Sequence, residues 1–238
     1  MAAGRLHLIL LAGGLGLRAQ GSDNVPKQFR PTGRGLLFTV SLGEFLSLDQ
    51  GSGFRPADLI LTVPDDWREA AAGALQKVDI PWGLAPAGTT RTGSTWNAVR
   101  ELEALHAPEP EDLVAVHDAA RPFASADLLV RLGRAVTGAQ GAVPGVPVPD
   151  TIVQSNEGMA SYLERSTLLA VQTPQVFRWN PFRAAHAWAA TQGADFTDDG
   201  GLMAARGLDP VVVPGEPGNW KVTTTGDWDR AQALLEPS

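Results

Sequence analysis

The chain has 238 residues, 44% of them hydrophobic, and a formal net charge of −7. This length and hydrophobic content predict one large α/β domain with a full core, and the acidic balance argues against a nucleic-acid-binding protein, which normally carries a basic face. The sequence contains no cysteine, which excludes disulfides, thiolate zinc sites and cysteine nucleophiles and is consistent with a cytoplasmic enzyme.

Continuous apolar runs alternate with helix-like segments along the first two thirds of the chain. Buried strands are predicted at residues 6–12, 59–63, 80–84, 113–117 and 141–148. Helices are predicted at residues 36–48, 67–76, 94–105 and 126–136, with residues 64–66 capping the second and Ser125 capping the fourth. The first apolar run lacks a signal-peptide pattern, and no later run approaches a membrane span. The alternation predicts a mostly parallel sheet with helices on both faces.

The rhythm changes after the fifth predicted strand. Residues 151–154 and 160–163 flank the turn-forming segment 155–158, which predicts a β-hairpin arm over about residues 150–168. Residues 172–175 form a polar turn, and Thr197 or Asp198 caps the second of the last three helices. The remaining elements are predicted as helices at 181–191, 198–206 and 226–235 and a strand at 210–213. We expect a single domain over residues 1–238.

A glycine-rich turn follows the first predicted strand. Gly13, Gly14 and Gly16 allow backbone amides to approach phosphate oxygens closely, and Arg18 comes two residues later. The turn also fits the dinucleotide pattern G-x-G-x-x-A, but the acidic residue expected about 20 positions later is missing. Two interpretations stay open: a triphosphate-binding loop over which Lys27 folds back, and a tight turn without a ligand.

Lysine is rare in this chain. Lys27 and Lys221 are two of only three lysines, against sixteen arginines. A compact ammonium held against phosphate oxygens is a role that a guanidinium fills poorly, so both lysines are candidates for contact with a phosphorylated ligand. Chance placement is the alternative interpretation.

Asp118 ends the fourth predicted strand. An aspartate at the carboxyl end of a buried strand is well placed to hold Mg²⁺ that bridges phosphate groups. The small Ala119 and Ala120 leave room for a ligand, and Arg121 can bind a second phosphate through its planar fork. The alternative is that Asp118 caps the next segment and pairs with Arg121. His117 should alternate away from Asp118 and pack in the core.

Because the carboxyl ends of parallel strands share one edge of a sheet, the loops at residues 13–18, 88–94 and 118–122 are expected to converge. Thr151 and Arg165, on either side of the hairpin, are candidates for a substrate phosphate, and Thr173 in the polar turn is a further candidate. Capping alone explains residues 197–199, although a second metal-binding carboxylate there is an alternative.

Six sequence blocks, taken together and in this order, resemble 2-C-methyl-D-erythritol 4-phosphate cytidylyltransferases of non-mevalonate isoprenoid biosynthesis. The resemblance covers nearly the whole chain and implies a Rossmann-like nucleotidyltransferase fold. It also implies a homodimer in which each hairpin arm reaches toward the partner's active site. The implied reaction joins CTP and methylerythritol phosphate, with Mg²⁺, into a CDP-alcohol and pyrophosphate. The blocks are residues 11–18, 26–29, 117–122, 149–151, 172–177 and 219–223.

The resemblance also implies a role for each matching residue. It assigns the triphosphate to the backbone of Ala12, Gly13, Gly14 and Gly16 with Arg18 and Lys27, the cytidine to Gly88, Ser94 and Ala119, the metal to Asp118 helped by Lys221, and the acceptor to Arg121, Thr151, Arg165 and Thr173.

Some blocks are closer to the related ribitol-5-phosphate cytidylyltransferase. Gly13 stands where the methylerythritol family usually has a second alanine, and residues 26–29 also match the ribitol enzyme more closely. Residues 118–121 and 165–168 look more like the methylerythritol enzyme. A ribitol-phosphate enzyme, a sugar-nucleotide-binding protein without catalysis and, more remotely, a dehydrogenase are the alternatives.

Overall fold

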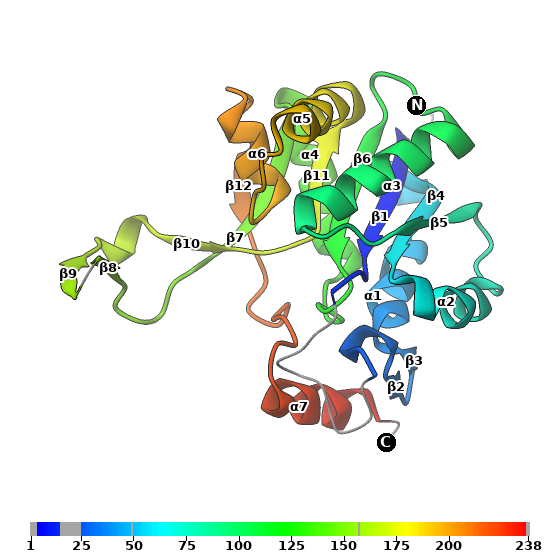
Figure 1. Ribbon diagram of the computed structural model, residues 1–238, viewed down its shortest axis with the longest axis horizontal. Coiled ribbons are helices and arrows are strands. Elements are labelled where there is room, and N and C mark those ends of the chain that lie inside the picture. The colour runs from blue at the N-terminus through cyan, green and yellow to red at the C-terminus, as the bar shows by residue number, and fades with distance from the viewer. Residues whose placement is uncertain (1–3, 15–24, 49, 157, 237–238) are drawn as a thin grey trace.

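The computed structural model describes residues 4–14, 25–48, 50–156 and 158–236. Its centre is an eight-stranded sheet with helices on both faces, and a hairpin arm projects to one side (Figure 1). The order of paired strands is β10-β7-β11-β6-β1-β4-β5, and β12 also pairs with β7. These strands are β1 Gly4–Leu11, β4 Phe54–Val63, β5 Trp82–Pro86, β6 Leu113–Asp118, β7 Gly141–Pro147, β10 Leu169–Val171, β11 Gln175–Arg178 and β12 Val211–Pro214.

The sheet is mostly parallel, as the sequence predicts. Strands β5, β4, β1 and β6 run in one direction, and β12 runs parallel to β7. The difference is β11, which lies antiparallel between β6 and β7, with β10 antiparallel to β7. The sequence pattern predicts a turn at residues 172–175, whereas Gln175 already begins β11. Residues Gln175–Arg178 have only two apolar side chains, Val176 and Phe177, between polar ones, so they show neither the alternation nor the continuous apolar run that marks a strand.

Seven helices are present in the described part of the chain. None of them is long and apolar enough to cross a membrane. All nine predicted strands and helices of the first two thirds form, with ends displaced by a few residues. The helices are α1 Leu37–Leu46, α2 Arg68–Leu75, α3 Arg91–His106, α4 Ala126–Ala135, α5 Trp179–Gln192, α6 Asp199–Ala205 and α7 Thr225–Leu235.

The two faces of the sheet carry separate hydrophobic cores. On β1, Leu8 and Leu10 point to the core shared with α1, α2 and α4, whereas Ile9 points to the core shared with α3, α5 and α6. Alternate residues of a strand face opposite sides of a sheet, and all three are buried here. This is why the strand reads as a continuous apolar run.

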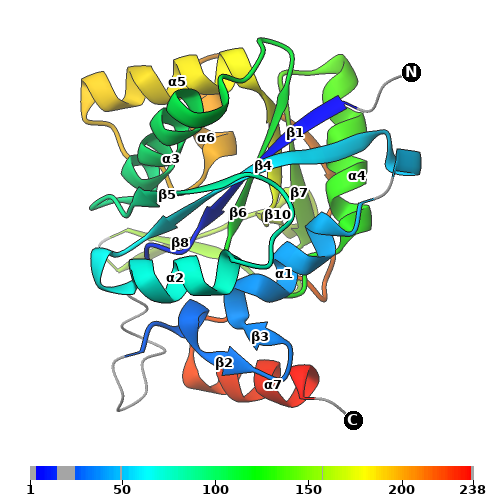
Figure 2. The same cartoon turned by 90° about the vertical axis from the view of Figure 1, so that its right-hand side faces the viewer.

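Helix α7 forms a third, smaller cluster at one end of the sheet. It packs near the short strands β2 Pro31–Thr32 and β3 Gly35–Leu36 (Figure 2). Buried Val222 and Leu235 meet Leu37 of α1, and Arg30 lies over the ring of Trp228, 5.4 Å from its centre. The cluster fixes the segment just before α7, which contains Lys221.

Two predicted helix caps are confirmed and one is wrong. Ser125 Oγ accepts from the Leu128 amide at 3.0 Å, and Asp198 Oδ1 accepts from the Gly201 amide at 2.9 Å. Residues 64–66 do not cap a helix through a side chain. Instead, the 3₁₀ turn Asp65–Trp67 leads directly into α2. The 3₁₀ turn satisfies early amides through the backbone, so no side-chain cap is needed.

The predicted hairpin arm is confirmed. Its strands are β8 Val153–Asn156 and β9 Met159–Tyr162, with Asn156 opposite Met159. The connection is shorter than the four-residue turn that the sequence predicts, because Ser155 and Asn156 already belong to β8. Both strands are exposed along their whole length, so within this chain the arm has no core of its own.

Candidate active site

A cleft of about 690 Å³ lies at the carboxyl edge of the parallel strands. The loops after β1, β5 and β6 meet there, as predicted, and the 3₁₀ turn η1 Lys27–Phe29 and the segment before α7 close it. It is lined by Leu11, Gly13, Gly14, Lys27, Gln28, Gly88, Thr89, Thr90, Arg91, Ser94, Asp118, Ala120, Lys221 and Thr223.

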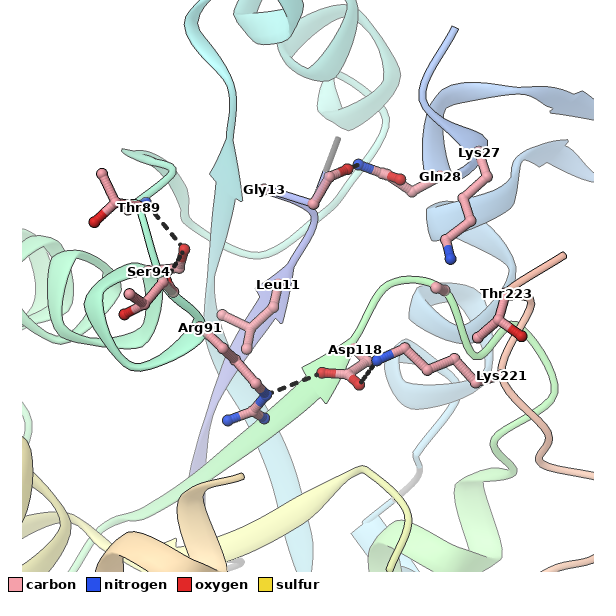
Figure 3. Close-up of a pocket in the computed structure, with 14 residues that line it drawn as sticks. Leu11, Gly13, Lys27, Gln28, Thr89, Arg91, Ser94, Asp118, Lys221 and Thr223 are labelled. Atoms are coloured by element: carbon pink, nitrogen blue, oxygen red, sulfur yellow. Dashed lines mark hydrogen bonds and ion pairs between the residues drawn. The ribbon is translucent and has the colours of Figure 1, made fainter. Parts of the chain in front are cut away.

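The first loop is held by Gln28, a residue to which sequence reasoning gave no role. Its side-chain amide donates to the carbonyl of Ala12 at 2.6 Å and to that of Gly14 at 2.7 Å. The backbone of the loop is therefore fixed at the mouth of β1. Lys27, next to Gln28, points toward the same space from the opposite wall (Figure 3). Gly16 and Arg18 lie outside the described residues.

Gly13 is required by close packing. A Cβ atom at this position would lie 2.7 Å from the Cβ of Ala87 in the second loop, closer than real Cβ contacts come. The two loops therefore touch at a point where only one of them can carry a methyl group.

The second loop folds around Ser94. The Ser94 hydroxyl accepts from the Gly88 amide at 2.9 Å and donates to the Thr90 carbonyl at 2.9 Å. A side chain on Gly88 would meet the backbone of residues 93 and 94, at 2.5 to 2.6 Å, so glycine is needed here too. Both predicted residues of this loop line the cleft.

The carboxylate of Asp118 lies between two cations. Lys221 Nζ contacts Oδ2 at 2.7 Å and Arg91 Nε contacts Oδ1 at 3.4 Å, from opposite sides (Figure 3). Burial by itself would raise the pKa of Asp118, but the charges of Arg91 and Lys221 outweigh burial and hold that pKa well below its usual range. Asp118 is therefore ionised at neutral pH.

Arg121 does not form the ion pair with Asp118 that was one interpretation of the sequence. Its guanidinium donates to the carbonyl of Asn219 at 2.9 Å. The Asn219 side chain donates to the carbonyl of Thr173 at 2.8 Å, and the amide of Val222 donates to the carbonyl of Ala120 at 2.8 Å. These bonds tie the segment before α7 to the loop after β6 and so bring Lys221 to Asp118.

Thr173 and His117 support Asp118 from behind. The Thr173 hydroxyl accepts from the Asp118 amide at 3.0 Å and can then donate to His117 Nδ1 at 3.2 Å. This leaves the His117 proton on Nε2, where it donates to the carbonyl of Arg121 at 2.9 Å. Burial lowers the pKa of His117 to about 4, so the ring is neutral and packed, as predicted.

Several predicted site residues do not line the cleft of their own chain. Ala12, Ala119 and Thr173 are buried beneath it and Arg121 does not line it either, whereas Ala120 reaches the surface of the cleft. Thr151 and Arg165 are exposed in the hairpin region, where the Arg165 guanidinium donates to a backbone carbonyl at 2.7 Å.

Sequence reasoning also missed Arg91, the first residue of α3. Its guanidinium reaches Asp118 on one side and Asp199 on the other, where the two atoms are 2.8 Å apart. Asp199 is buried, and its carboxylate contacts Arg91 and His186, so it does not open into the cleft as a second metal ligand. The sequence held one indication of this role, because Arg91 lies in the loop at residues 88–94, which was expected to converge with the loop that begins at Asp118.

Asp118 fits Mg²⁺ only in combination with a ligand. Among the described residues, no group of three or more histidine, cysteine, aspartate or glutamate side chains could hold a metal ion. Mg²⁺ is commonly held by one or two carboxylates together with phosphate oxygens and water. A lone ionised carboxylate at the base of a cleft with a glycine-rich loop matches that donor set.

Known proteins resemble this chain over nearly its full length. A family model described as 2-C-methyl-D-erythritol 4-phosphate cytidylyltransferase matches residues 6–237. The chain is 36% identical over 237 residues to a bifunctional enzyme IspD/IspF of Rhodopseudomonas palustris (strain BisA53), and the match covers 97% of this chain and 56% of that relative. The chain thus spans about half the length of the curated relatives it matches.

Two solved structures show the same fold. The crystal structure of 2-C-methyl-D-erythritol 4-phosphate cytidylyltransferase from Thermus thermophilus is 30% identical, with a TM-score of 0.72 over 96% of this chain and 98% of that one. The 4-diphosphocytidyl-2C-methyl-D-erythritol synthase of Anaerococcus prevotii DSM 20548 has a TM-score of 0.80 over 99% and 97% of the two chains, and at 24% identity it supports the fold alone.

The buried neutral state of His117 predicts a pH-dependent stability. The unfolded chain protonates this ring below its ordinary pKa of 6.5, but the folded protein does so only below about 4. Between these values the unfolded state binds more protons, so the free energy of unfolding should fall as the pH falls, by roughly 3 kcal/mol at most for this residue. Urea unfolding from pH 7 to pH 4.5 measures this slope.

The control is His117→Gln, which keeps a donor for the Arg121 carbonyl but does not titrate. The variant should have a flatter pH dependence than the wild type, because the other three histidines are the same in both proteins. Equal slopes would show that His117 is protonated in the folded state or that its ring is not buried as described.

Proposed function

The chain belongs to the 2-C-methyl-D-erythritol 4-phosphate cytidylyltransferase family, and we propose that it transfers CMP from CTP to 2-C-methyl-D-erythritol 4-phosphate. The products are 4-diphosphocytidyl-2-C-methyl-D-erythritol and pyrophosphate, and the reaction belongs to non-mevalonate isoprenoid biosynthesis. The family match over residues 6–237 supports one catalytic domain, and the hairpin of β8 and β9 supports an arm at about residues 150–168. A reaction that consumes CTP favours the cytoplasm as its location.

The observation that carries the proposal is the ionised Asp118 between two cations at the base of the cleft. In the reaction, a phosphate oxygen of the acceptor attacks the α-phosphorus of CTP in line, and pyrophosphate leaves. No covalent intermediate with the protein is needed. Two anions must meet, so positioning and charge neutralisation supply most of the rate enhancement.

We assign the triphosphate to the first loop and the lysines. The backbone of residues 12–16 and the side chains of Arg18 and Lys27 would contact its oxygens, and Gln28 holds the loop in place through two carbonyls. The loop with Gly88 and Ser94 would contact the cytosine. Both loops line one cleft, which supports their acting on a single nucleotide.

We assign Mg²⁺ to Asp118. The ion supplies positive charge to the phosphate oxygens when it is bound. Lys221 holds the carboxylate at Oδ2 and adds a second positive charge to the cleft. Because Asp118 is ionised at any pH near neutrality, no proton has to leave before a cation can bind.

We assign the acceptor phosphate to Arg121, Thr151 and Arg165, with Thr173 supporting Asp118 from behind. Thr151 and Arg165 belong to the arm region and do not line the cleft of their own chain, so we propose that they act in the cleft of a second copy. The arm region has the apolar surface that a partner would cover. Its exposed large hydrophobic residues are Val153, Met159, Tyr162 and Leu163, and Leu169 and Val171 of the adjoining strand β10 are exposed as well.

Ribitol 5-phosphate is the alternative acceptor, because Gly13 and residues 26–29 are closer to the ribitol-phosphate enzymes. Gly13 has a local reason in this chain, since a side chain there would collide with Ala87. The glycine therefore reflects loop packing, and it gives no argument for a different acceptor. Methylerythritol phosphate is the substrate that the family match supports.

The function is tested by incubating the protein with CTP and Mg²⁺ and with either methylerythritol 4-phosphate or ribitol 5-phosphate. We expect pyrophosphate release and a CDP-methylerythritol mass with the first acceptor. Preferential formation of CDP-ribitol would change the substrate, and CTP binding without pyrophosphate from either acceptor would favour a binding protein.

Lys27→Ala tests the catalytic lysine. We expect turnover to fall by roughly 100-fold or more and CTP affinity by less than about tenfold, because the ammonium neutralises charge that develops in the transition state. Single-turnover rates and calorimetric CTP binding separate the two effects. Lys77→Ala, at the exposed third lysine, is the matched control and should leave both unchanged. An unchanged single-turnover rate at saturating CTP would remove Lys27 from the transition state.

Complementation tests whether the arm serves the partner's cleft. Asp118→Asn and Arg165→Ala should each be nearly inactive alone. In a mixture, roughly a quarter of wild-type activity should return, because half of the dimers are mixed and each has one intact site. If the arm serves its own cleft, mixed dimers contain no intact site and activity stays lost. Light scattering of the wild type must also give the mass of a dimer.

A further inference from the structure

A row of side chains with alternating charges leads from the cleft into the core behind it. Lys221 and Arg91 contact the two oxygens of Asp118, and Arg91 continues to Asp199. Asp199 Oδ1 accepts from His186 Nε2 at 3.1 Å. The proposed function uses Asp118 and Lys221, but it gives no role to Arg91 or to the buried pair behind it, Asp199 and His186.

Arg91 is held more closely by Asp199 than by Asp118. The distance to Asp199 Oδ2 is 2.8 Å, whereas that to Asp118 Oδ1 is 3.4 Å. The Asp199 side chain is only 1% exposed, compared with 13% for Asp118. Charges interact more strongly where water is excluded, so the buried carboxylate is the main counterion of the guanidinium.

Asp199 is fixed relative to Arg91 by a second set of bonds. The Thr92 hydroxyl accepts from the Phe196 amide at 2.9 Å, just before α6, and the Thr92 amide donates to Asp195 at 3.4 Å. These bonds join the start of α3 to the segment that leads into α6. Together with the contact to Asp199, these bonds hold Arg91 from behind.

The pKa values are consistent with a fully ionised pair. Burial alone would raise the pKa of Asp199, but the charge of Arg91 and the hydrogen bond from His186 lower it to about 2. Burial opposes the charge of Arg91, but Asp199 and Asp118 outweigh burial and hold the pKa of Arg91 above its ordinary value. Both groups stay charged across the physiological pH range.

We propose that Arg91 is a positioning residue, anchored by Asp199, that orients the Asp118 carboxylate and sets how strongly it binds the divalent cation. This inference rests on the proposed function. Asp199 takes the closer contact with the guanidinium, so Arg91 holds Asp118 Oδ1 only at 3.4 Å and a cation can compete for that oxygen. If Asp199 were neutral, the full charge of Arg91 would act on Asp118 and compete with the metal.

The proposal predicts opposite effects for two neighbouring substitutions. Asp199→Asn should weaken metal binding by about tenfold, and Arg91→Met should strengthen it by about threefold, because they remove charges of opposite sign near one carboxylate. Arg91→Met should nevertheless lower turnover, because the carboxylate loses its orientation. A purely structural role for the pair would lower the melting temperature in both variants without such a difference in sign.

The measurement is Mn²⁺ binding by electron paramagnetic resonance, with CTP present and no acceptor. It reads metal affinity without catalysis. The double variant Asp199→Asn/Arg91→Met closes a thermodynamic cycle, and in the Arg91→Met background Asp199→Asn should change the Mn²⁺ affinity by at most about twofold. The double variant also removes both buried charges together, so it gives a result even if one single variant does not fold.

Asp58→Asn is the matched control. Asp58 is buried to the same extent as Asp199 and also pairs with a histidine, His7, but it does not line the cleft. This variant should lose stability and keep the wild-type Mn²⁺ affinity.

Three results would overturn the proposal. Equal or same-direction changes in Mn²⁺ affinity for Asp199→Asn and Arg91→Met would remove Arg91 as the link, and so would an undiminished effect of Asp199→Asn in the Arg91→Met background. The third result is that the wild type with CTP binds no Mn²⁺. In that case the assignment of the metal to Asp118 fails as well, whereas the first two results overturn only the role of Arg91.

Discussion

The site depends on one carboxylate that stays charged in a poorly hydrated place. Asp118 is largely buried, and desolvation alone would favour its neutral form. Two cations from distant parts of the sequence prevent this, Arg91 at the start of α3 and Lys221 before α7. Most of the surrounding structure can be understood as the means of bringing these three side chains together.

Each of the three side chains is positioned by a different part of the fold. The parallel register of β1 and β6 places Asp118 beside the end of β1, opposite Leu11. Arg91 is the first residue of α3, the helix that follows β5, and Thr90 caps that helix. In the sheet, β5 lies two strands from β1, on the side away from β6. Lys221 arrives from the far end of the chain, fixed by the apolar cluster under α7 and by bonds to the loop after β6. The site therefore requires both the sheet and the C-terminal helix.

The sequence predicted the fold well where the pattern is long. Strands such as β1 and β6 are continuous apolar runs buried on both faces, and α4 has a clear apolar stripe that buries Leu128, Leu129 and Leu132. It failed at β11, whose four residues lie between β6 and β7 in the opposite direction, because pairing with two distant strands leaves no local signal. The cap predicted for α2 failed because a 3₁₀ turn satisfied the same amides through the backbone.

The sequence by itself determined the residue types that phosphate chemistry requires. It placed the glycine turn and Asp118 at the ends of strands, and it singled out Lys27 and Lys221 because lysine is rare in this chain. Only the tertiary structure decided which cations neutralise Asp118. Arg91 and Arg121 look alike in the sequence, yet Arg91 reaches the carboxylate while Arg121 binds a backbone carbonyl. The reason is physical, because an ion pair depends on distance and burial, and these are set by contacts between residues far apart in the chain.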